Sequence, residues 1–257
     1  MEFEHKVVVI TGASSGIGAA CAVEFAKLSA KLSLISRNKD KLTKVGDQCQ
    51  KINGLKPMII IADISVEEDV NRIVEETINH FGKIDILVNN AGTCVMGKTQ
   101  NGIEAFDRVM GTNVRGTFLL TDKIIPHLIK SKGNIVNISS ILSTKPLSSM
   151  TAYCISKAAL DMFTQCVALE LGPKGVRVNS VNPGAIKTNL FVSAGLSKQE
   201  NDEIFQFYEK VAPLQKIAKV EDVANIVVFL ASDRAKCVTG SKYVVDCGAI
   251  IAEGLLN

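Results

Sequence analysis

TGASSGIG, residues 11–18, follows a short run of valine and isoleucine and precedes an amphipathic segment. Glycines at positions 12, 16 and 18 permit a tight turn and a close approach of the backbone. At a helix start, unpaired backbone amides and the helix dipole can hold a pyrophosphate. The spacing G-x-x-x-G-x-G differs from the common G-x-G-x-x-G fingerprint, but the glycines serve the same physical purposes. The stretch therefore predicts a dinucleotide-binding turn between the first strand and the first helix.

Short β-branched runs alternate with amphipathic stretches along the chain, which is the pattern of βαβ units. The expected strands are 6–10, 32–36, 58–64, 84–90, 134–139, 176–182 and 242–246; the expected helices are 17–29, 38–52, 66–81, 103–131, 151–171 and 220–231. Gly82, Gly133 and Gly172 are placed as helix stops. Right-handed crossovers then give a doubly wound, Rossmann-type α/β fold, a seven-stranded parallel sheet with helices on both faces.

The connection at 189–216 interrupts this rhythm, and it is long for a plain loop. We expect it to form a lid with a helix of its own. With that lid, residues 1–257 are expected to form a single dinucleotide-binding and catalytic domain.

Composition excludes several classes of function. The net charge of +3 comes from scattered lysines and arginines without interleaved aromatics, so no nucleic acid partner is expected. No apolar run approaches about 18 residues, which predicts neither a signal peptide nor a membrane span, and hence a cytoplasmic protein. Seven dispersed cysteines without a C-x-x-C pair predict reduced thiols packed as small apolar groups, with no metal site.

The glycine turn also matches G-x-S-x-G through Gly12, Ser14 and Gly16, the nucleophile elbow of α/β-hydrolases. That mechanism needs a histidine later in the chain that is free to reach the serine. His80 and His127 fall inside expected helices, and His5 precedes the serine. The hydrolase interpretation therefore fails.

The second strand should end near the cofactor's adenosine ribose, where an acid selects NAD and an arginine accommodates a 2′-phosphate. The chain has Ser36, Arg37 and Asn38 at that point, which favours NADP(H). Two observations keep NAD(H) open: Arg37 also suits a solvated charge after a strand, and position 15 is serine rather than a second basic residue.

Tyr153 and Lys157 are four residues apart in an expected helix, so the phenol and the ammonium share one face. A cation beside a phenol favours its ionised form, which prepares the pair for acid–base chemistry.

With this pair, the glycine turn and Asn89-Asn90-Ala91-Gly92, the chain resembles the short-chain dehydrogenase/reductase family in its single-domain form, from about residue 6 to 248. The resemblance implies a catalytic set of Asn113, Ser140, Tyr153 and Lys157. Counting thirteen residues back from the tyrosine selects Ser140 over Ser139. One departure, Asp246-Cys247-Gly248 where two glycines often follow the aspartate, affects no proposed chemistry.

The expected cofactor contacts extend over several motifs. They are Gly12, Ser14, Ser15, Gly16, Ile17, Gly18, Ser36, Arg37, Asn38, Asp63, Ile64, Asn90, Ala91, Gly92, Tyr153, Lys157, Pro183, Gly184, Ile186 and Thr188.

The resemblance implies hydride transfer between the nicotinamide and a carbonyl carbon. Tyr153 would exchange a proton with the substrate oxygen, Ser140 would hydrogen-bond that oxygen, and Lys157 would tune the phenol and hold the ribose. Lys157 and the oxidised nicotinamide together are expected to lower the pKa of Tyr153. Asn113 would hold a water that links Lys157 to solvent, and the protein would form a homodimer or homotetramer through helices 103–131 and 151–171.

Apolar residues near the site predict a lipophilic small-molecule substrate, such as a steroid or isoprenoid ketone. The pocket candidates are Cys94, Met96, Leu142, Met150, Phe191 and Phe205. Alternatively, these groups pack the lid onto the sheet. A 3-oxoacyl thioester reductase and a broad carbonyl reductase remain open, as does a non-catalytic NADP(H)-binding sensor or scaffold.

Overall fold

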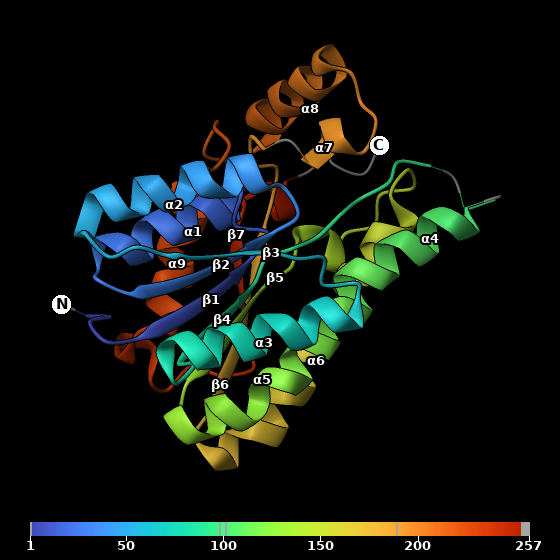
Figure 1. Cartoon of the computed structure of the whole chain (residues 1–257). Coiled ribbons are helices and arrows are strands. Elements are labelled where there is room, and N and C mark those ends of the chain that lie inside the picture. Colours follow the sequence, from blue (N-terminus) through green and yellow to red (C-terminus); the bar gives the residue numbers. More distant parts are fainter. Residues whose placement is uncertain (1, 98, 101, 189, 253–257) are drawn as a thin grey trace.

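The computed structural model describes residues 2–97, 99–100, 102–188 and 190–252. Its centre is a seven-stranded parallel sheet in the order β3-β2-β1-β4-β5-β6-β7 (Figure 1). The strands are β1 (Val7–Thr11), β2 (Lys31–Ser36), β3 (Met58–Ile61), β4 (Ile86–Asn89), β5 (Asn134–Ile138), β6 (Arg177–Pro183) and β7 (Lys242–Val245). The predicted fold class is therefore confirmed.

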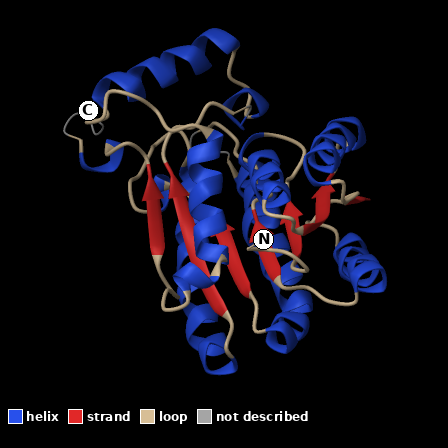
Figure 2. Ribbon diagram, turned by 90° about the vertical axis from the view of Figure 1, so that its left-hand side faces the viewer, coloured by secondary structure: helices blue, strands red, loops and turns tan. Residues whose placement is uncertain are grey.

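Two helical layers cover the sheet because its central strands are apolar on both faces. One layer contains α1 (Gly16–Lys27), α2 (Lys39–Asn53) and α9 (Val220–Ala231); the other contains α3 (Glu67–Phe81), α5 (Thr117–Ser131) and α6 (Thr151–Leu171). Each layer has its own buried cluster, with Phe25 and Leu34 in the first and Ile73 and Leu120 in the second. Figures 1 and 2 show the helices on either side of the strands.

The strand order reverses between β1 and β4, which run side by side although β2 and β3 lie between them in sequence. In open α/β sheets, ligands bind beyond the carboxyl ends of the strands at such a switch point. The fold therefore places the candidate site where the glycine turn leaves β1.

The expected helix at 103–131 contains three helical segments: α4 (Ile103–Met110), a π-helical turn (Gly111–Gly116) and α5. A Cβ on Gly116 would lie 2.6 Å from the carbonyl oxygen of Ile64, so only glycine allows the close approach of this turn to the segment after β3. Asn113 lies within the π turn, and such turns often occur at functional sites.

The expected lid contains two helices, α7 (Leu190–Ser193) and α8 (Lys198–Val211). Ser197 and Glu200 form a capping box that starts α8. Both helices stand beyond the carboxyl end of the sheet (Figure 1). Residue 189, the expected first residue of the lid, lies outside the described residues.

Four short 3-10 turns complete the described elements: Ile141–Ser143, Gly172–Lys174, Asp233–Ala235 and Ala249–Ile251. The third strand is shorter than predicted, because Asp63 accepts hydrogen bonds from the amide and the hydroxyl of Ser65 and turns the chain away from the sheet. Of the three predicted helix stops, Gly82 is confirmed as a left-handed cap. Gly172 is confirmed as the C-cap residue that follows α6, although it keeps a right-handed conformation and begins the short 3-10 turn that ends before Gly175. Lys132, not Gly133, adopts the left-handed conformation after α5.

All seven cysteines are free, but only Cys21, Cys49 and Cys94 are buried. Cys166 and Cys237 are exposed, so the prediction that the thiols pack as small apolar groups is wrong for these two. Among the described residues, no helix has the length and apolar character needed to cross a membrane.

Candidate active site

A cavity of about 360 Å³ lies at the switch point, within the size range of small-molecule sites. Most of the predicted cofactor residues line it: Gly12, Ser14, Ser15, Gly16, Ile17, Ser36, Arg37, Asp63, Ile64, Asn90, Ala91, Gly92, Tyr153, Lys157, Pro183, Gly184, Ile186 and Thr188. Gly18 and Asn38 do not line it.

The glycine turn presents the start of α1 to this cavity. Ser15 is the N-cap residue, its side chain makes no capping bond, and the first turn holds no acidic residue. The amides at this end therefore suit an anionic group. Gly16 has a left-handed φ of +57°, and a Cβ there would lie 3.2 Å from Thr188 Cγ2. The turn thus has the chemistry and the space that a pyrophosphate needs.

Gly18 serves packing within the turn. The Asn90 amide donates hydrogen bonds to the carbonyl oxygens of Thr11 and Gly12, at 2.9 and 3.1 Å. A Cβ on Gly18 would lie 2.4 Å from Asn90 Nδ2 and from Gly12 O. Gly18 therefore allows the end of β4 to fix the shape of the turn.

At the end of β2, Arg37 is exposed and its guanidinium lies 3.3 Å from the Asp63 carboxylate. Burial opposes ionisation of Asp63, but the Ser65 hydrogen bonds and the Arg37 charge outweigh it and lower the pKa of this carboxyl. The Ser36 hydroxyl donates to Ser14 Oγ at 2.7 Å. Asn38, predicted to contact the cofactor, instead caps α2 by accepting from the Lys41 amide at 2.9 Å.

Three predicted catalytic side chains meet at the other end of the cavity. Ser140, Tyr153 and Lys157 all line it, and each is largely buried. Lys157 Nζ lies 5.5 Å from the centroid of the Tyr153 ring and donates to the Ile138 carbonyl oxygen at 2.7 Å. Ser139 also reaches the cavity wall, but its hydroxyl donates to the Lys157 carbonyl oxygen at 3.2 Å. The Ser140 side chain, rather than that of Ser139, acts on the pKa of the phenol.

Burial governs the protonation of the pair. It raises the pKa of Tyr153, and the Ser140 side chain only partly opposes this rise. Burial also lowers the pKa of Lys157 to about 8, against the opposing charge of Asp161. Burial therefore outweighs any effect of the lysine charge on the phenol in the protein alone, and Tyr153 keeps its proton at neutral pH.

Asn113 does not line the cavity but lies directly behind Gly92. Its Oδ1 accepts from the Thr93 amide at 2.8 Å, and its Nδ2 donates to Thr93 O and Ser156 Oγ, at 2.9 and 3.0 Å. A Cβ on Gly92 would lie 3.4 Å from Asn113 Oδ1 and 3.7 Å from Lys157 Nζ. The side chain therefore joins the π turn to α6 and to the wall beside Lys157.

The predicted substrate residues divide into three groups. Leu142, Met150 and Phe191 line the cavity. Cys94 and Met96 pack in the same apolar cluster behind its wall. Phe205 is placed elsewhere: it packs 6.2 Å from the Phe191 ring and faces a separate groove between α1 and α8.

The sequence motifs missed several lining residues, among them Leu190, Ser193, Tyr208, Arg108 and Thr112. Tyr208 stands in the same aromatic run as Phe205, three residues later on α8, but Tyr208 lines the cavity and Phe205 does not. No motif marks Arg108 or Thr112, which reach the cavity through the helical segment 103–116. None of the histidines lines the cavity, in agreement with the failure of the hydrolase interpretation.

The doubly wound sheet and the glycine turn at its switch point place the chain in the Rossmann-type class. Residues 12–249 match the family described as enoyl-(acyl carrier protein) reductase. A meso-2,3-butanediol dehydrogenase from Serratia marcescens is 36% identical over 256 residues, 99% of this chain and 98% of the relative. The versicolorin reductase stcU of Emericella nidulans is 36% identical over 96% of both chains. The chain belongs to the short-chain dehydrogenase/reductase family of oxidoreductases.

Solved structures agree with this assignment. A short-chain dehydrogenase/reductase of unknown function from Caenorhabditis elegans, solved with cofactor, has a TM-score of 0.94 and 33% identity, covering 99% of this chain and 98% of that one. A 3-ketoacyl-(acyl-carrier-protein) reductase from Brucella melitensis with NADH has a TM-score of 0.88 and 33% identity, over 96% and 99% of the two chains. L-sorbose reductase from Gluconobacter frateurii, complexed with NADPH and L-sorbose, has a TM-score of 0.90 and 33% identity, over 97% and 98%.

Proposed function

We propose that the protein transfers a hydride between NADP(H) and a carbonyl or secondary alcohol. The observation that carries this proposal is the meeting of Ser140, Tyr153 and Lys157 in the cavity that also contains the start of α1. When bound, the nicotinamide cofactor supplies the hydride. The chain's own residues then bind and orient the reactants and move the proton.

Each side chain has a separate task in reduction. Tyr153 holds its proton because burial raises the pKa of the phenol, so it can donate that proton to the alkoxide oxygen as it forms. The Ser140 hydroxyl lies beside the phenol and hydrogen-bonds the same oxygen. The Lys157 ammonium stabilises negative charge on the phenol after the proton has left. Asn113 supports the cavity wall beside Lys157. In this proposal it also binds a water molecule that links Lys157 to solvent.

Testing the activity requires a broad panel. NADPH oxidation should be followed with lipophilic ketones, quinones, small diketones and 3-oxoacyl thioesters. Turnover of at least one ketone supports the proposal, whereas tight NADPH binding without turnover of any compound would identify a sensor or scaffold instead.

A lipophilic substrate is supported by the apolar part of the wall. Leu142, Met150 and Phe191 surround the Tyr153 end of the cavity, together with Leu190 and Tyr208 from the lid. Among the charged lining groups, Arg37 and Asp63 belong to the opposite end, at the close of β2 and β3, and Arg108 reaches the cavity from α4. We therefore place steroid- or isoprenoid-like ketones ahead of oxoacyl thioesters in the panel.

NADP(H) rather than NAD(H) is supported by Arg37, whose exposed guanidinium at the end of β2 can bind a 2′-phosphate. The Arg37→Gln variant should lose affinity for NADPH by about 10- to 100-fold, the range for one charge-assisted hydrogen-bonded contact, and should keep its affinity for NADH. Fluorescence titration measures both constants, and the chain has no tryptophan to contribute to the signal.

The matched control for Arg37 is Lys51→Gln, which removes the same charge at the far end of α2. It should leave both affinities unchanged. An equal loss of NADPH and NADH affinity in Arg37→Gln, or tighter binding of NADH than NADPH by the unaltered protein, would contradict the NADP(H) assignment.

We also propose that the protein is a cytoplasmic homo-oligomer, a dimer or tetramer. The free thiols suit a reducing compartment. Phe118 on α5 and Met162 and Leu169 on α6 are exposed, Leu169 to 82%, on the two helices expected to pair. The double variant Met162→Lys/Leu169→Lys should therefore have a lower mass by light scattering. Leu55→Lys, at an exposed leucine after α2, should keep the mass of the unaltered protein. Equal masses for the unaltered protein, the double variant and Leu55→Lys would exclude this face as the interface between subunits.

A further inference from the structure

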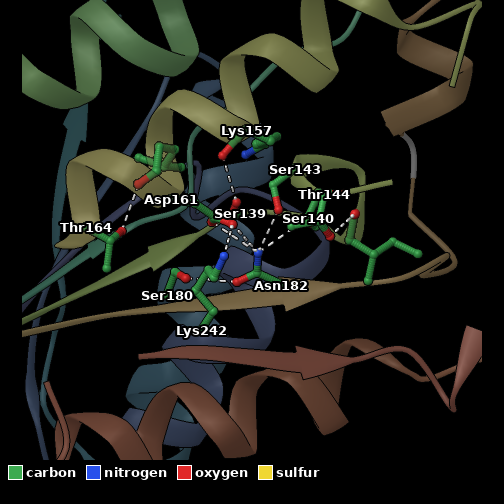
Figure 3. A network of polar contacts seen from close by, with 12 residues as sticks. Ser139, Ser140, Ser143, Thr144, Lys157, Asp161, Thr164, Ser180, Asn182 and Lys242 are labelled. Carbon is green, nitrogen blue, oxygen red and sulfur yellow. Dashed lines mark hydrogen bonds and ion pairs between the residues drawn. The ribbon is translucent and has the colours of Figure 1, made fainter. Parts of the chain in front are cut away.

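A buried carboxylate lies behind the catalytic side chains. Asp161 follows Lys157 by four residues on α6, so the two side chains share a helix face, and Asp161 is only 5% exposed. Its two oxygens accept from Asn182 Nδ2 at 3.1 and 3.0 Å, and Lys242 Nζ lies 3.7 Å from Oδ2 (Figure 3). Asp161 thus connects three elements, α6, β6 and β7.

The Asn182 amide extends this contact to the serine of the site. Its Nδ2 also lies 3.1 Å from the Ser140 carbonyl oxygen and 3.1 Å from Ser143 Oγ (Figure 3). Its Oδ1 accepts from the Ser180 hydroxyl at 2.8 Å, which fixes the amide orientation. The Ser140 hydroxyl in turn accepts from the Leu142 amide at 3.1 Å. The carboxylate and the Ser140 turn are therefore held by the same amide group.

The charge of Asp161 also acts on Lys157. Lys157 is only 4% exposed. The polar groups near its ammonium are the Tyr153 ring on its own helix, the Cys94 thiol after β4 and the Ile138 carbonyl of β5, and both Lys157 and Asn113 lie close to Gly92. Cys94 is neutral at physiological pH because burial raises the pKa of its thiol to about 11. Asp161 is thus the group whose negative charge opposes the effect of burial on Lys157. Lys242, on the edge strand, neutralises part of that charge.

We propose that Asp161 is a positioning residue for the reaction: its carboxylate keeps Lys157 protonated and, through Asn182, holds Ser140 at the cavity. Lys242 sets how much of the Asp161 charge reaches Lys157. This inference rests on the proposed function for its catalytic meaning, but the electrostatic coupling is a property of the chain alone.

The coupling predicts opposite effects from two variants. Asp161→Asn keeps an oxygen acceptor for Asn182 but removes the negative charge, so the pKa of Lys157 should fall by about one, at the low end of the effect of a neighbouring opposite charge. Lys242→Met removes a cation that competes for Asp161, so the pKa of Lys157 should rise. A purely structural role for Asp161 predicts no such opposition.

Two measurements test this order of Lys157 pKa values, lowest in Asp161→Asn and highest in Lys242→Met. The ε-carbon of Lys157 can be titrated by NMR in protein labelled with ¹³C-lysine, with the signal assigned by its loss in Lys157→Met. In kinetics of ketone reduction, the alkaline fall of kcat should move to lower pH in Asp161→Asn and to higher pH in Lys242→Met. Well above pH 8, turnover in Asp161→Asn should approach one tenth of normal because of protonation alone.

The matched control is Glu170→Gln, which makes the same charge change at an exposed position on the same helix and should leave the Lys157 titration unchanged. Equal Lys157 titrations in Asp161→Asn, Lys242→Met and the unaltered protein would overturn the inference. If the unaltered protein reduces no carbonyl compound but the NMR order holds, the proposed function fails and the coupling stands.

Discussion

Tyr153→Phe is expected to lower kcat for carbonyl reduction by about 10³-fold, within the range for loss of a positioned general acid. The phenol and the Ser140 hydroxyl line the same cavity, and burial raises the pKa of the phenol and so keeps it protonated. Phenylalanine keeps the ring in its apolar surroundings beside Cys94 and Met150. The loss should therefore appear in single-turnover NADPH oxidation, while the melting temperature stays close to normal.

Tyr208→Phe is the matched control, because it removes a phenol hydroxyl from the lid side of the same cavity. It should reduce kcat by less than tenfold. Turnover in Tyr153→Phe within tenfold of normal would show that another group or water donates the proton, and the mechanism proposed here would then be wrong.

Much of the fold follows from patterns that act over short distances. The glycine turn, the apolar strands and the amphipathic helices predicted the seven-stranded sheet, because each of these features fixes local geometry. The choice of Ser140 over Ser139 came from the family resemblance rather than from a local pattern, and it stays a prediction. The Ser139 hydroxyl donates to the Lys157 backbone carbonyl oxygen, which supports that choice.

Side-chain direction and protonation depend on tertiary contacts that the sequence does not display. Asn38 follows a strand as a cofactor ligand would, yet the adjoining helix uses it as a cap. Phe205 and Tyr208 share one lid helix, but only Tyr208 faces the cavity. The pair of Tyr153 and Lys157 suggested a phenol that ionises readily. Burial, which arises from the packing of α6 against the sheet, instead raises the pKa of the phenol.

Lys157→Met should separate activity from stability. We expect a loss of kcat of about 10³-fold, since the charge that stabilises the phenolate is gone. The folded protein should nevertheless become more stable at neutral pH. The pKa of Lys157 falls from 10.5 to about 8 on folding, so below pH 8 the unaltered protein carries a buried ammonium that methionine does not.

The free energy of unfolding should depend on pH in a direction that tests this pKa shift. Between pH 8 and 10.5 the unfolded chain holds a proton on Lys157 that the folded chain has lost, so this lysine makes the unaltered protein more stable as pH rises, by up to about 3 kcal/mol in total. Lys157→Met lacks this gain. Its advantage in free energy of unfolding should be largest below pH 8 and should shrink toward pH 10.5, as measured by urea denaturation at a series of pH values.

Lys44→Met, at an exposed lysine on α2, should follow the unaltered protein throughout. A constant difference in free energy of unfolding between Lys157→Met and the unaltered protein across this range would show that the lysine keeps its ordinary pKa. The proposed effect of burial on Lys157 would then be wrong.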